Sequence, residues 1–86
     1  MNTKLDTYCK NNGLRSTPQR HWVLIALKNK MYPVDATLLW IHLKSNDYNI
    51  SLSSVYSSLQ VLVEAGLVIR TMSSSKKYVY QIKNQE

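Results

Sequence analysis

The stretch that decides the fold is ISLSSVYSSLQVLVEAGLV, residues 50–68. Its apolar residues recur at helical spacing, so we expect a helix over residues 52–65 with one inner stripe. That stripe comprises Leu52, Val55, Leu59 and Leu62. Ser51 is typical of the residue that caps a helix start, and Gly66 is typical of the left-handed residue just after a helix end. After the glycine, the apolar residues continue as the start of a strand.

The outer face of this helix is short, polar and uncharged as far as Glu64. It carries Ser53, Ser54, Tyr56, Ser57 and Gln60. A compact face of hydroxyl and amide groups suits insertion into the major groove of DNA, where base edges present donors and acceptors. An ordinary solvated helix surface would explain the same residues, so both interpretations stay open at this point.

Length and composition restrict the choice further. The 86 residues allow one domain, and no apolar run approaches the roughly 18–20 residues that cross a bilayer. The first residues lack the layout of a signal peptide, so we expect a cytoplasmic protein. The net charge of +6 favours a polyanionic partner such as nucleic acid. The single cysteine, Cys9, is expected to be a small buried hydrophobe.

The remaining periodicity predicts three more helices and a hairpin. The helices cover residues 2–12, 18–29 and 36–45, with Thr17 and Asp35 as caps of the second and third. Residues 31–34 are interpreted as a linker, and strands over residues 67–72 and 77–82 form a hairpin. This order, mainly α with a small β-hairpin, is that of one winged helix-turn-helix domain over residues 1–86. The second helix of such a pair enters the major groove.

Each predicted element turns one face to the core. The expected inner residues are Leu5, Tyr8 and Cys9; then Arg20, Val23, Leu24 and Leu27; then Ala36, Leu39, Trp40 and Leu43; and, on one side of the last strand, Tyr78, Tyr80 and Ile82.

Two segments resemble the DNA-binding domain of the ferric uptake regulator (Fur) family. GLRSTPQR at residues 13–20 is similar to the family pattern GLR-x-TPQR, and residues 50–68 are similar to ISL-x-TVYR-x-L-x-x-L-x-E-x-GLV. The resemblance covers roughly residues 4–82. It implies a bacterial-type regulator of transcription that binds double-stranded DNA.

The resemblance also implies roles for single residues. The expected base contacts are Tyr56, Ser53, Ser57, Ser54 and, in a narrow minor groove, Arg15. The expected phosphate contacts are Arg20, Ser51, Lys76 and Lys77. Arg20 also lies near the packed face, so a structural role for it stays open.

Three departures from the family pattern bear on function. Ser57 stands where the family places an arginine, and Pro33 lies where it places a metal-sensing histidine. We expect the C-terminal metal-binding and dimerisation domain of the family to be absent, in a natural short protein or a fragment. His21 and His42 are isolated in sequence, so we expect no metal and no cofactor. Only two glycines and five scattered acids are present, and this composition predicts no enzyme.

Several large apolar residues lie off the expected inner faces, namely Trp22, Ile25, Leu38, Ile41, Val61 and Val63. Either the first helix and the hairpin cover them, or part of the set forms a surface for self-association or for a partner. The main hypothesis is therefore a metal-independent, sequence-specific DNA-binding regulator, with a homodimer as one expected form. The alternative is a protein-interaction winged helix that binds another regulator or a polymerase through Trp22, Ile25, Leu38 and Ile41.

Overall fold

The computed structural model describes residues 3–14 and 17–83, with four helices and a hairpin in these ranges. The elements are α1 (Thr3–Asn11), α2 (Pro18–Lys28), α3 (Ala36–Ser45), α4 (Leu52–Glu64), β1 (Val68–Met72) and β2 (Tyr78–Ile82). The predicted winged helix-turn-helix class is confirmed, and each predicted bound lies within one residue of the observed one.

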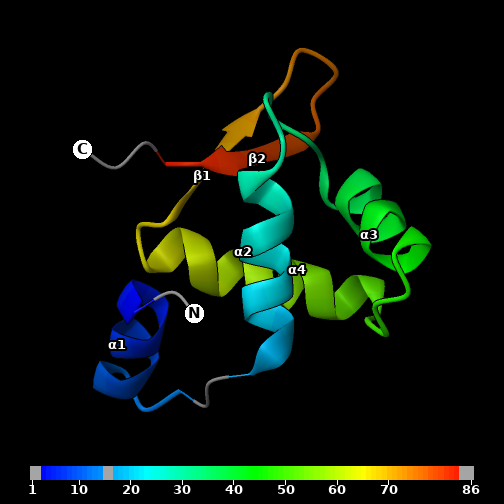
Figure 1. Ribbon diagram of the computed structural model, residues 1–86. Coiled ribbons are helices and arrows are strands. Elements are labelled where there is room, and N and C mark those ends of the chain that lie inside the picture. The colour runs from blue at the N-terminus through cyan, green and yellow to red at the C-terminus, as the bar shows by residue number, and fades with distance from the viewer. Residues whose placement is uncertain (1–2, 15–16, 84–86) are drawn as a thin grey trace.

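The four helices and the hairpin surround one core. In Figure 1, α2 crosses α4, with α1 on one side of the molecule and α3 on the other. Helix α2 packs against α3, α4 and β2, and it thereby joins the helix-turn-helix pair to the hairpin. The fully buried side chains come from α1, α2, α3 and α4, and the largest are Leu5, Leu24, Leu27, Leu39, Leu43, Leu59 and Leu62. The hairpin is thus mounted on the helical core.

Two of the three predicted helix caps are confirmed. The Ser51 hydroxyl accepts a 3.1 Å hydrogen bond from the backbone N–H of Ser54, and Asp35 Oδ1 accepts one of 2.8 Å from Leu38. Thr17 occupies the cap position of α2, but its side chain makes no capping hydrogen bond. The prediction of a hydroxyl cap there is wrong, because Pro18 at the first helical position starts the helix through its fixed φ and missing N–H.

Three helices end in the same way. After α4, the N–H of Leu67 donates to the carbonyl of Leu62 (3.0 Å) and Gly66 takes φ +77°. This pattern is a Schellman motif, in which a left-handed residue lets the chain satisfy the last helical carbonyls. The end of α1 repeats it at Gly13, and the end of α3 repeats it at Asp47, with φ +66° at both. Asp47 therefore adopts the left-handed conformation that glycine usually adopts at a helix end.

The hairpin is antiparallel, with a register that runs from Val68 opposite Ile82 to Met72 opposite Tyr78. Its sheet is extended by an isolated bridge, in which Val34 and Tyr80 exchange backbone hydrogen bonds of 3.0 and 2.8 Å. The interpretation of residues 31–34 as a plain linker is therefore wrong at Val34. That residue is buried and ties the lead-in of α3 to the hairpin.

Some predicted inner residues lie further out than expected. Leu52 is only half-buried, whereas Ser58 is buried on α4. On β2, Tyr80 is buried but Tyr78 is 49% exposed. Tyr78 pairs with the last residue of β1, close to the hairpin tip, where the strand extends past the helical core.

The apolar residues predicted off the inner faces divide into two groups. Trp22, Val61 and Val63 are partly buried against the core. Ile25, Leu38 and Ile41 stay exposed, at 53%, 56% and 50% of their surface. Among the described residues, none of the helices is long and apolar enough to cross a membrane.

Candidate nucleic-acid interface

The outer face of α4 is open to solvent. Ser53, Ser57 and Gln60 are exposed, and the Tyr56 side chain keeps 50% of its surface accessible. Ser54 is half-buried, and its hydroxyl accepts a 2.9 Å hydrogen bond from Ser51. Four of the five polar residues predicted on this face are therefore available to a partner.

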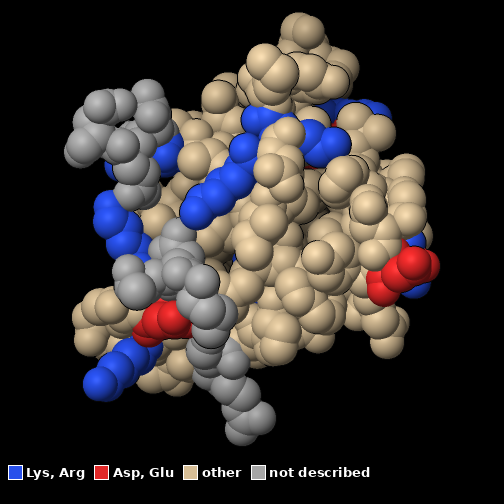
Figure 2. Space-filling model, in the orientation of Figure 1, with Lys and Arg blue, Asp and Glu red and all other residues tan. Residues whose placement is uncertain are grey.

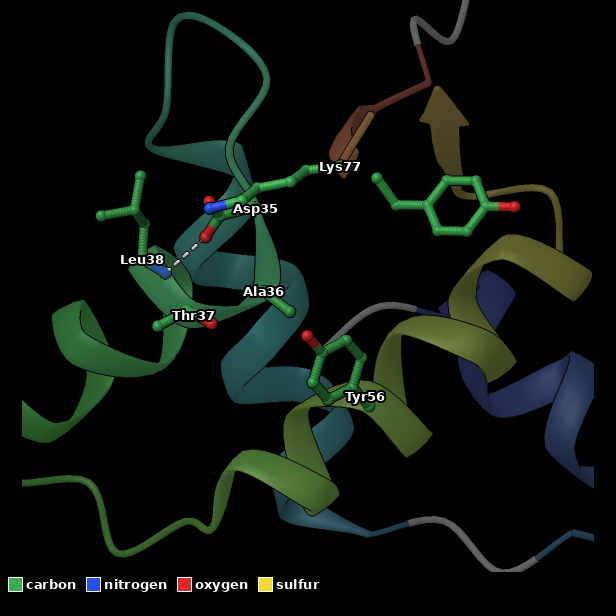
Figure 3. A pocket seen from close by; sticks show the side chains of 7 residues that line it. Asp35, Ala36, Thr37, Leu38, Tyr56 and Lys77 are labelled. Atoms are coloured by element: carbon green, nitrogen blue, oxygen red, sulfur yellow. Dashed lines mark hydrogen bonds between the residues drawn. The ribbon is translucent and has the colours of Figure 1, made fainter. Parts of the chain in front are cut away.

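Tyr56 opens onto a groove of about 500 Å³. The start of α3 forms one wall, α4 contributes Tyr56, and the hairpin contributes Lys77 and Tyr78. Figure 3 shows the Tyr56 hydroxyl pointing toward the first turn of α3, with Lys77 reaching over the groove from the hairpin. The groove brings together residues that are far apart in sequence and combines an aromatic ring, a cation and a helix N-terminus.

The hairpin tip adds positive charge beside this groove. Lys76 and Lys77 are both exposed, and the Ser73 N–H closes the turn on the Lys77 carbonyl at 2.8 Å. Lys76 takes φ +63°, which turns the chain sharply at this point. Figure 2, which views the molecule from the side of α2, shows Lys and Arg side chains across the upper part of that face, with acidic side chains toward its edges. The two predicted lysines are therefore accessible to a partner at the hairpin tip.

Arg70 is a functional candidate that the sequence reasoning missed. It projects from β1 as an exposed residue, and its guanidinium carbon lies 4.7 Å from the centre of the Tyr78 ring. One of its nitrogens also approaches the side-chain oxygen of Gln60 on α4, at 3.5 Å. The available signal was a single charged residue in an otherwise uncharged strand, which indicates a solvent-facing position but no role.

Burial and neighbouring side chains change the pKa of Tyr80 on β2. Burial raises the pKa of its phenol above the ordinary value of 10.0, and the neighbouring Arg70 guanidinium acts in the opposite direction. Tyr56 and Tyr78 also raise this pKa, because each becomes negative when it ionises. The hydroxyl of Tyr80 therefore stays protonated at neutral pH.

Two predicted contact residues, Ser51 and Arg20, are engaged in contacts within the protein. The Ser51 hydroxyl is engaged in the cap of α4. Arg20 is half-buried between α1 and α2, where its guanidinium lies 3.8 Å from the sulfur of the buried Cys9. This geometry favours the structural role that the sequence left open for Arg20. Arg15 falls outside the described residues.

The polar groups between α1 and α2 do not fit a metal site. His21 is buried, and its Nε2 lies 3.2 Å from a carboxylate oxygen of Asp6. Over residues 3–14 and 17–83, no three His, Cys, Asp or Glu side chains are grouped so that they could hold an ion. We assign no metal ligand in these ranges.

Solved structures share this fold. The Vibrio cholerae ferric uptake regulator superimposes with a TM-score of 0.77 at 27% identity, over 93% of this chain and 62% of that chain. The Helicobacter pylori ferric uptake regulator gives 0.86 at 26% identity, over 98% and 56%. That structure is described as having three functional metal binding sites. The expectation of a metal-free regulator therefore conflicts with what is seen in relatives.

The chain is also similar in sequence to a curated regulator. The peroxide operon regulator of Bacillus subtilis (strain 168) is 41% identical over 59 residues, which make up 69% of this chain and 41% of that protein. The chain thus spans less than half the length of this curated relative. The Ferric uptake regulator family matches residues 11–86, and this match includes the helix-turn-helix pair and the hairpin. The chain therefore belongs to the Ferric uptake regulator family.

Proposed function

We propose that the chain binds double-stranded DNA in a sequence-specific manner and regulates transcription. The observation that carries the proposal is the groove at Tyr56. A half-exposed aromatic side chain on the second helix of a helix-turn-helix pair opens toward a lysine-bearing hairpin. The relatives are named as regulators, which supports the same function.

In this proposal α4 lies in the major groove. Tyr56, Ser53 and Ser57 face the bases, where the tyrosine ring packs on thymine methyl groups and the hydroxyls contact base edges. Ser54 contributes mainly by supporting the cap, because its hydroxyl is bound to Ser51. Lys76 and Lys77 contact phosphates from the hairpin, and Arg15 is assigned to the minor groove.

Metal independence is a further part of the proposal. It is supported by the side chains that form the groove, since they include one carboxylate, Asp35, whose Oδ1 already caps α3. Binding by this chain should therefore be unchanged by a chelator. Because the Helicobacter pylori relative has metal binding sites, a titration in a chelator is the direct test of this expectation.

The test is fluorescence anisotropy with a pool of random duplexes, one round of selection, a salt titration and a parallel titration in EDTA. Enrichment of one sequence, with a slope of log K against log salt of about −5, would support a specific regulator that neutralises five or six phosphates. A palindromic sequence with half-sites about 34 Å apart would indicate a dimer. Weak binding with no enriched sequence would overturn the proposal.

A second candidate function follows from the exposed apolar residues. Ile25, Leu38 and Ile41 each leave at least half of their side chain accessible, although Trp22 is partly buried. Exposed apolar side chains of this kind fit a protein partner, either a second copy or another regulator. Sedimentation of the chain alone and with its selected duplex tests the first case. A monomer at high micromolar concentration, both free and on DNA, would exclude self-association.

A further inference from the structure

The proposed recognition helix lacks positive charge. Helix α4 runs from Leu52 to Glu64 without a lysine or arginine, and its one charged residue is Glu64. A helix in a DNA groove is surrounded by phosphates, so an acidic residue without a nearby cation opposes binding. A cation from another element beside this helix would offset the charge of Glu64 and favour DNA binding.

Arg70 occupies that place. It comes from β1, yet its guanidinium reaches the side-chain oxygen of Gln60 on the exposed face of α4, one turn beyond Tyr56. The other end of the Gln60 amide donates a 2.8 Å hydrogen bond to Glu64. Arg70, Gln60 and Glu64 therefore form a chain that brings a positive charge onto the helix surface.

The Arg70 guanidinium stacks on the aromatic ring of Tyr78. The Tyr78 ring lies 4.7 Å from its central carbon, a cation–π distance. Arg70 also stands directly opposite Tyr80 in the hairpin register, and Tyr80 is buried. A stacked guanidinium loses less rotational freedom on binding than a free lysine does.

These contacts leave donors on Arg70 for a ligand. A guanidinium has five N–H groups, and Arg70 uses some of them in a side-chain hydrogen bond to Tyr80 and in the contact to Gln60. The Gln60 contact, at 3.5 Å, stands at the upper limit for a hydrogen bond. A phosphate oxygen accepts charge-assisted hydrogen bonds from arginine in a bidentate geometry, which an amide oxygen cannot match. A phosphate at this position would therefore replace or share the contact to Gln60.

We propose that Arg70 binds a DNA phosphate beside α4, and that Tyr78 and Gln60 hold its guanidinium in position for that contact. The inference rests on the proposed DNA binding. Arg70 on β1 would thus add a further phosphate contact to those made by Lys76 and Lys77 at the hairpin tip. A phosphate bound by Arg70 would fix how far α4 enters the major groove of DNA, because Arg70 contacts the exposed face of that helix.

The test is an affinity measurement on the full chain, with the selected duplex and a random duplex, across a salt series. Arg70→Ala should weaken both complexes by roughly tenfold or more, since a charge-assisted hydrogen bond is lost. It should also flatten the slope of log K against log salt by about 0.9. Lys28→Ala is the matched control, because Lys28 is an exposed cation on the α2 face that carries Ile25. This control should leave the slope unchanged.

Each outcome separates the two proposals. If the unmodified chain binds neither duplex, the DNA-binding function fails. If the unmodified chain binds and Arg70→Ala keeps its salt slope, the phosphate contact at Arg70 is overturned while the function stands. Circular dichroism checks that the variants are folded. Should Arg70→Ala unfold, Arg70→Gln removes the charge, keeps most of the stem and is held to the same slope criterion.

Discussion

The indole N–H of Trp40 donates a 2.9 Å hydrogen bond to the backbone carbonyl of Ile50. Trp40 lies in the middle of α3, and Ile50 immediately precedes the cap of α4. The bond therefore spans the turn of the helix-turn-helix pair and fixes the point at which α4 begins. A partly buried indole satisfies a carbonyl that would otherwise lose its contact with water.

Replacing Trp40 with Phe removes this donor while it keeps an aromatic ring. We expect the free energy of unfolding to fall by about 1–2 kcal/mol, because the Ile50 carbonyl is left without its partner. Urea denaturation followed by circular dichroism measures the change. An unchanged midpoint would show that water takes over the bond.

Asp47→Gly should stabilise the protein. Asp47 holds φ +66° at the end of α3, where glycine adopts this conformation without the steric cost of a Cβ atom. The substitution also removes a negative charge from a helix C-terminus, where the macrodipole disfavours it. We expect a gain of about 0.5–1 kcal/mol by urea denaturation.

The matched control for Asp47→Gly is Gly66→Ala. Gly66 occupies the same position after α4, and a Cβ there would meet no atom within 4 Å. Any loss, expected at about 1 kcal/mol, would therefore come from the backbone and not from a clash. Equal effects of the two variants in the same direction would contradict the left-handed assignment.

Ser51→Ala tests whether the Ser51 hydroxyl serves the helix or DNA. The hydroxyl caps α4, so its loss should cost about 1 kcal/mol of stability. Ser51→Asp restores a capping acceptor but brings a negative charge. We expect Ser51→Asp to match the unmodified chain in thermal denaturation and to bind DNA more weakly if a phosphate lies nearby. Full affinity for Ser51→Asp would argue that no phosphate approaches residue 51.

Tyr56→Ala is expected to cost about 1–3 kcal/mol of binding to the selected duplex and much less on random DNA, because the side chain is assigned to base readout. Lys77→Ala is the contrasting variant. It should weaken both duplexes alike and flatten the salt slope by about one unit. Fluorescence anisotropy measures both variants. Equal losses on both duplexes for Tyr56→Ala would remove Tyr56 from the base-reading role.

Local signals in the sequence predicted most of the fold. The helix bounds follow from apolar spacing and from caps such as Asp35 and Ser51, whose partners are only three residues away. The left-handed residue after α3 was missed because an aspartate fills it. The short bridge between Val34 and Tyr80 joins positions that are distant in sequence, and no local pattern encodes such a pairing.

The candidate site was predicted less completely. The face of α4 could be read from periodicity, since Ser53, Tyr56 and Ser57 are indeed exposed. The wall of the groove supplied by the start of α3 and the contact between Arg70 and Gln60 depend on how α3, α4 and the hairpin pack together. Those relations are set by the core, and the sequence gives no direct sign of them.

The bridge between Val34 and Tyr80 has a consequence for local unfolding. A two-stranded hairpin alone is marginally stable, and this one shares its buried tyrosine with the segment that leads into α3. The amides of both residues should therefore exchange with deuterium only when the hairpin and the helices open together. The amides of Ser74 and Ser75 lie in the exposed turn at the tip and should exchange rapidly. We therefore expect slow exchange at the base of the hairpin, which is coupled to the core, and fast exchange at the turn.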